Sequence, residues 1–166
     1  SPGEFIPLAE SNGLILRIGR ITTKLVVQQL AAWRDEGMEL RPVSINYSSM
    51  QMADTGYIDY LFELLEEYRI DPSLIEIEIT ERLVMRHEKE TSAFFGRLQQ
   101  AGIKILMDDF GTGYSSLNYL AYIPGDVIKF DKSIVDAFLV CEADTTEEDS
   151  DSRGNEFVRN LVRMSH

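Results

Sequence analysis

Short β-like runs alternate along this 166-residue chain with longer stretches in which apolar residues recur at helical spacing. The β-like runs are Pro42–Tyr47, Leu74–Ile79, Ile103–Met107 and Asp126–Phe130. Helix is expected over 19–36, where Ile21 and Leu25 stand at helical spacing, and over 56–69 and 86–101. A short helix is expected to end at Leu120, and further helix is expected from Lys132 onward and over Glu156–Arg163. Strands separated by helices predict successive βα units, and so an α/β fold with a parallel sheet and right-handed crossovers. A doubly wound sheet and part of a (β/α)8 barrel both satisfy this pattern.

Polar side chains stand where each β-like run ends. In chain order they are Asn46, Glu78, Asp108, Asp109, Lys129 and Asp131. Side chains alternate between the two sides of a strand, and the positions opposite these polar groups are apolar and suit packing under helices. For any single position, an exposed face or a loop explains the polar residue equally well. Together they favour an active site, because (β/α) folds place active sites at the carboxyl ends of their strands.

The chemistry of these side chains points to a divalent cation. Carboxylates together with one amide oxygen are hard ligands, which suit Mg²⁺ or Mn²⁺. The adjacent acids Asp108 and Asp109 repel each other, and a bridging cation relieves that repulsion. Lys129 adds a positive donor for a phosphate or for a water molecule. The set therefore resembles metal-assisted phosphodiester hydrolysis more than acyl transfer, and His87 and His166 lie too far from the strand ends to support a zinc site.

A glycine-rich segment follows the two aspartates directly. It consists of Gly111, Thr112, Gly113, Tyr114, Ser115 and Ser116. Its glycines permit a loop with positive φ, and its hydroxyls can bind phosphate or cap the following helix. A plain turn with an N-cap explains the segment equally well, and it fits neither the P-loop nor the dinucleotide-binding fingerprint.

The charge of the chain excludes some classes of partner. The formal net charge is −12, so the chain repels nucleic-acid backbones and anionic membranes, and we expect neither DNA nor RNA as a partner. Half of that excess lies in the run EADTTEEDSDS at 142–152. A run this polar cannot bury enough apolar surface to become ordered, so we expect a disordered acidic insert at about 141–155.

The cysteine content and the lack of long apolar stretches favour a cytoplasmic protein. Cys141 is the one cysteine and has no internal disulfide partner, which suits a reducing compartment. No apolar stretch approaches the roughly 20 residues that span a bilayer, so this segment is not expected to contact a membrane. Tethering to the inner membrane through other segments remains compatible with this expectation.

Five motifs, in order, resemble those of the EAL-domain family, the bacterial cyclic di-GMP phosphodiesterases. They are PGEFIPLAE at Pro2–Glu10, SINYS at Ser44–Ser48, EITE at Glu78–Glu81, DDFGTGYSSL at Asp108–Leu117 and IKFD at Ile128–Asp131. The resemblance implies a (β/α)8 TIM barrel that hydrolyses cyclic di-GMP to linear pGpG with Mg²⁺ or Mn²⁺. It implies that Asn46, Glu78, Asp108 and Asp109 are metal ligands.

The resemblance also implies roles for other residues. Lys129 would orient or deprotonate the attacking water, and Glu81 would anchor the loop Gly111–Leu117, through which the family couples metal binding to dimer contacts. The IKFD motif, which ends at Asp131, would place that residue beside the substrate and the loop.

The chain departs from the family pattern at both ends. The Glu-Ala-Leu triplet and the Glu-Gly-Val-Glu region are not in these residues, so we expect residues 1–166 to be a partial EAL domain of about four parallel strands, impaired as an isolated chain. The alternative is a catalytically inactive cyclic di-GMP receptor or protein-interaction module. A metal-dependent barrel enzyme acting on another substrate is a third possibility.

Overall fold

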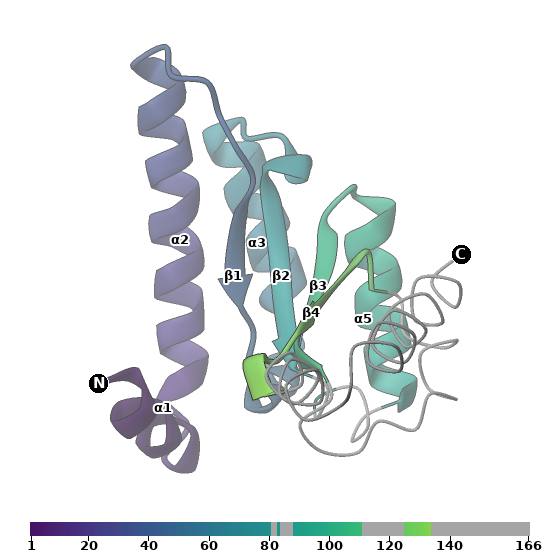
Figure 1. Ribbon diagram of the computed structural model, residues 1–166. Helices are drawn as coiled ribbons and strands as arrows, with labels where there is room; N and C mark the ends of the chain where they lie inside the picture. Colours follow the sequence, from purple (N-terminus) through teal and green to yellow (C-terminus); the bar gives the residue numbers. More distant parts are fainter. Residues whose placement is uncertain (81–82, 84–87, 111–124, 134–166) are drawn as a thin grey trace, which may run out of the picture.

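The computed structural model describes residues 1–80, 83, 88–110 and 125–133 (Figure 1). Its four strands are β1 (Val43–Asn46), β2 (Ile75–Thr80), β3 (Lys104–Phe110) and β4 (Val127–Phe130). All neighbouring strands are parallel, and their order in the sheet is their order in the chain. A doubly wound sheet reverses its strand order at a switch point, whereas a (β/α)8 barrel does not. The sheet is therefore an arc of a barrel, as one of the two sequence interpretations predicted.

The helices predicted through Leu120 and over Glu156–Arg163 lie outside the described residues. The described helices agree with the other predicted stretches in position but less well at their ends. They are α1 (Pro2–Ser11), α2 (Leu14–Asp35), α3 (Tyr57–Tyr68) and α5 (Glu88–Gln100), with short 3-10 turns η1 (Ser49–Ala53) and η2 (Pro72–Leu74). The first helix was not expected. It begins with Pro2 in its first turn and a capping box between Ser1 and Glu4, both of which favour a helix start.

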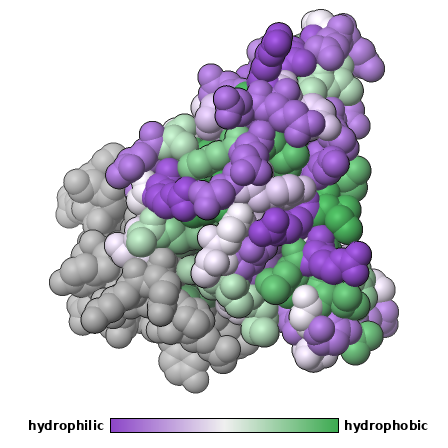
Figure 2. Space-filling view, turned by 180° about the vertical axis from the view of Figure 1, so that it is seen from behind, coloured by the Kyte–Doolittle hydropathy of each residue, from purple (hydrophilic) through white to green (hydrophobic). Residues whose placement is uncertain are grey.

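Helix α2 buries a different face from the one that the sequence pattern indicated. Ile21 and Leu25 are 55% and 60% exposed, whereas the buried face includes Thr23, Val27 and Leu30. Figure 2 shows apolar areas beside hydrophilic ones on the rear surface of the molecule. The expectation failed because apolar residues lie on both sides of this helix, so spacing alone could not decide which side packs.

The core lies between the sheet and the helices, with α3 behind the sheet in the view of Figure 1. The apolar sides of three strands are buried there, through Ile45, Ile75, Ile77, Ile105 and Met107, none of them more than 3% exposed. These are the positions that strand alternation assigned to the side opposite the polar residues. The polar residues therefore lie on the other side of the sheet, which in a barrel is the interior.

A buried polar contact joins α2 to α3. The hydroxyls of Thr23 and Tyr57 lie 2.8 Å apart, and the two residues are 0% and 1% exposed. Thr23 Oγ1 also lies 2.9 Å from the Gly19 carbonyl oxygen, to which it donates. Burial raises the pKa of Tyr57 to about 12, because a phenolate loses its hydration in the core.

This tyrosine predicts a loss of stability at alkaline pH. In the unfolded chain Tyr57 titrates near pH ~10, so its contribution is complete below that pH and is lost as the pH rises through about 12. Urea unfolding between neutral pH and the alkaline range should show a falling free energy of unfolding. Tyr57→Phe, which lacks the titrating hydroxyl, should show a shallower fall, and equal slopes would contradict the prediction.

Among the residues that the structure describes, none of the helices combines the length and the apolar character needed to cross a bilayer.

Candidate active site

The polar strand ends meet at the carboxyl edge of the sheet. Asn46 pairs in register with Glu78, and Thr80 pairs with Asp108. The backbone N–H of Tyr47 continues the ladder past β1 by donating to the Glu78 carbonyl oxygen at 2.8 Å. Because parallel strands in register end together, three strands present their last polar residues along one edge.

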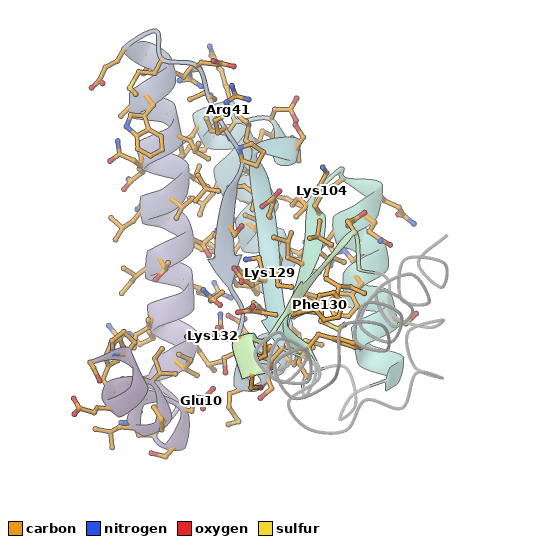
Figure 3. The ribbon with its side chains drawn as sticks, in the orientation of Figure 1. Glu10, Arg41, Lys104, Lys129, Phe130 and Lys132 are labelled. Atoms are coloured by element: carbon orange, nitrogen blue, oxygen red, sulfur yellow. The ribbon has the colours of Figure 1, made fainter. Side chains whose placement is uncertain are left out.

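A short ion pair crosses the sheet at this edge, and its lysine, Lys129, is labelled in Figure 3. Lys129 Nζ on β4 lies 2.6 Å from Glu78 Oε1 on β2. Strand β3 lies between these two strands, so both side chains must project from the same side of the sheet and meet above β3. The Glu78 side chain is 10% exposed and that of Lys129 is 41% exposed.

The neighbourhood of Lys129 is acidic. The Glu78 carboxylate, with smaller contributions from Asp108 and Glu76, holds the pKa of the Lys129 ammonium above its ordinary value. Glu76 lies two residues before Glu78 on the same side of β2, and its Oε2 accepts a hydrogen bond from Ser44 Oγ at 2.8 Å. The site thus concentrates negative charge around one cationic group.

Strand β3 carries a bulge at the two aspartates. Met107 pairs with Ile128 and Phe110 pairs with Phe130, so two residues of β3 oppose Lys129 alone. Asp109 takes up the extra residue with a φ of 56°, in the left-handed region that aspartate tolerates better than most residues. The strand therefore continues to Phe110, three residues beyond the predicted end at Met107.

The bulge changes which side of the sheet each residue faces. In a regular strand Asp108 and Asp109 would face opposite sides, as the sequence pattern implied. Here Met107 and Phe110 share the apolar side, where Phe110 packs edge-on against Phe130 with ring centroids 5.7 Å apart. Asp108 and Asp109 both lie between Met107 and Phe110, so neither carboxylate has to face the apolar side. Asp108 is partly buried and Asp109 is exposed.

Gln51 supports the β1 end of the site and was missed by sequence reasoning. Its Oε1 accepts from the Ser48 backbone N–H at 2.9 Å, and its side chain is 3% exposed. A Cβ placed on Gly19 would lie 2.0 Å from Gln51 Nε2, so any larger residue at this position would force the Gln51 side chain to shift. The Ser-x-x-Gln spacing of a capping box was the signal that could have identified Gln51.

The other expected site residues either hydrogen-bond elsewhere, lie at the exposed edge of the sheet or fall outside the described residues. The Asp131 carboxylate accepts from Ser133 N at 2.8 Å and from Ser133 Oγ, and these hydrogen bonds hold the pKa of Asp131 below its usual value. Asn46 is exposed. Glu81, the segment Gly111–Leu117 and the acidic run at 141–155 lie outside the described residues. Within the part of the chain that the structure describes, no three acids, histidines or cysteines come close enough to hold a metal ion.

The chain matches the EAL domain family over residues 1–166. It is 40% identical over 134 residues to the cyclic di-GMP phosphodiesterase PdeR of Escherichia coli, covering 81% of this chain and 20% of that protein. It is 39% identical over 135 residues to the signaling protein YkoW of Bacillus subtilis, covering 81% of this chain and 17% of that protein. The chain thus spans about a fifth of the length of these relatives.

Solved structures with the same fold include proteins with a bound cyclic dinucleotide. The PaMucR phosphodiesterase in its c-di-GMP complex matches with a TM-score of 0.76 and 32% identity, over 99% of this chain and 67% of that one. The Xanthomonas citri FimX EAL domain in complex with c-diGMP matches with a TM-score of 0.80 over 99% of this chain and 62% of that one. The latter is 21% identical and indicates the fold alone.

Proposed function

Because this chain belongs to the EAL domain family, we propose that its protein is a phosphodiesterase that hydrolyses cyclic di-GMP to linear pGpG with Mg²⁺ or Mn²⁺. The observation that carries the proposal is the cluster at the carboxyl edge of the sheet. There Glu78 and Lys129 lie 2.6 Å apart, and Asp108 lies close enough to influence Lys129. These groups come from three neighbouring strands, which is how a (β/α) fold assembles a catalytic site.

The donor set suits a divalent cation. Asn46, Glu78, Asp108 and Asp109 would hold it through amide and carboxylate oxygens, which Mg²⁺ and Mn²⁺ prefer. The Lys129 ammonium, a cation already in contact with Glu78, marks a place where positive charge is stabilised. When bound, the metal would supply Lewis-acid polarisation of the scissile phosphate and a more acidic water.

The protein groups then have distinct tasks in the proposed reaction. Lys129 would orient the attacking water by hydrogen bonding, and its charge would offset that of the phosphate oxygens. One phosphorus–oxygen ester bond is replaced by a bond to the water oxygen, and the departing ribose oxygen takes up a proton. Glu81 would anchor the segment Gly111–Leu117, and Asp131 would lie near the substrate.

We also propose, from the family resemblance, that the protein is cytoplasmic and forms a homodimer through the segment Gly111–Leu117. The single cysteine of the chain fits a reducing compartment. The net charge of −12 makes nucleic acid an unfavourable partner, whereas a cation between the acids and a cyclic dinucleotide removes that repulsion.

The test of this function is incubation of the whole protein with cyclic di-GMP in Mg²⁺, in Mn²⁺ and with a chelator, followed by chromatographic detection of pGpG. We expect product with either metal and none with the chelator. The alternative is a receptor that binds the nucleotide without cleaving it. Nucleotide binding without any pGpG would establish that alternative.

A further inference from the structure

The Lys129 ammonium is paired with the carboxylate of Glu78, which is one of the proposed metal ligands. Its Nζ lies 2.6 Å from Glu78 Oε1, at the distance of a strong charge-assisted hydrogen bond. The Glu78 side chain is only 10% exposed, so few directions of approach remain for another cation. This inference rests on the proposed function, because it concerns the same acids as metal ligands.

We propose that Lys129 and the divalent cation compete for Glu78, so that the lysine holds the acidic cluster together without metal and moves away when metal binds. Glu78, Asp108 and Glu76 all attract the Lys129 ammonium, so three like charges gather around one position and a counter-charge there offsets their mutual repulsion. The ammonium supplies one. A divalent cation at the same carboxylate would repel the ammonium, so the two do not share the carboxylate.

The Lys129 ammonium can leave Glu78 in two directions, toward solvent or toward Glu76. Its side chain is 41% exposed, and a long flexible stem lets the ammonium move toward solvent at little cost. Glu76, fixed by its 2.8 Å hydrogen bond from Ser44, already attracts the ammonium and offers an alternative acceptor on the same side of β2. The displaced ammonium would then remain on the same side of the sheet as the acids, where the proposed reaction requires it. Metal binding would therefore precede and produce the catalytic position of Lys129.

Calorimetric titration of the whole protein with Mn²⁺ alone tests the competition. Lys129→Met removes the competitor and should bind Mn²⁺ roughly two- to fivefold more tightly than the unmodified protein, given the strength of a partly exposed ion pair. The matched control is Lys104→Met, which removes one positive charge from the first residue of β3, at the opposite end of the sheet. It should leave the affinity unchanged, and equal affinities for all three proteins would overturn the proposal.

A second measurement uses the unmodified protein and so does not depend on the folding of a variant. Reductive methylation, read out by mass spectrometry of the peptide that contains Lys129, should become faster when Mn²⁺ is added, because the amine leaves its ion pair. Lys104 serves as the internal reference. An unchanged ratio of the two rates would overturn the proposal. Neither readout requires turnover, so a failure to produce pGpG would count against the proposed function alone.

Discussion

Replacing Glu78 by glutamine is expected to lower cyclic di-GMP turnover by about 100-fold or more. Glutamine keeps the length of the side chain but removes the negative charge, which pairs with Lys129 and is proposed to bind the cation. Losing a residue that merely supports a metal ligand costs about 10–100-fold, and Glu78 is proposed as a ligand itself. The measurement is the initial rate of pGpG formation at saturating Mn²⁺, together with the affinity for Mn²⁺.

The matched control for this variant is Glu67→Gln, which makes the same change at an exposed position on α3. It should retain normal turnover. Far-ultraviolet circular dichroism of both variants checks that the fold is kept, because Glu78 is buried and its pair with Lys129 crosses β3. A folded Glu78→Gln protein with near-normal turnover would remove Glu78 from the list of metal ligands.

Leu30→Ala is expected to lower the free energy of unfolding by about 2–5 kcal/mol, the range for a leucine removed from a packed core. Leu30 lies on α2, is 0% exposed and belongs to the cluster that joins this helix to the sheet and α3. Alanine leaves a cavity in that cluster. Urea unfolding followed by tryptophan fluorescence measures the loss, since Trp33 is partly buried in the same helix.

Helix α2 also offers the control. Leu25 is the same residue type five positions earlier and is 60% exposed. Leu25→Ala should change the free energy of unfolding by no more than about 0.5 kcal/mol, as surface substitutions usually do. If the two variants lost equal stability, Leu30 would owe its apparent importance to something other than burial.

The sheet and its polar edge were predictable because period-two alternation carries direct information about the sides of a strand. Ile75 and Ile77 are fully buried while Glu76 and Glu78 project to the other side, as their spacing indicated. No single strand encodes the barrel-like strand order, and the residue pattern alone was compatible with both a doubly wound sheet and a (β/α)8 barrel. The family motifs favoured it before the structure confirmed it.

Other features depend on contacts that spacing cannot express. The bulge at Asp109 exists only in relation to β4, and no local pattern marks it. The Glu78–Lys129 pair joins residues 51 positions apart, on strands that are not neighbours. Helix α2 has apolar residues on two sides, and only the packing of the other elements decides that Leu30 is inside and Leu25 outside. Tertiary contacts, and not the local sequence, determine these features.

The bulge in β3 means that the aspartate pair is one residue longer than the pairing with β4 requires. Substituting one of the acids changes a charge but leaves every later residue on its own side of the sheet. Deleting either Asp108 or Asp109 would leave a single residue opposite Lys129 and so remove the bulge, while Phe110 would remain opposite Phe130. One of the two acids is thus surplus to the pairing with β4, and the strand accommodates it through the left-handed backbone at Asp109.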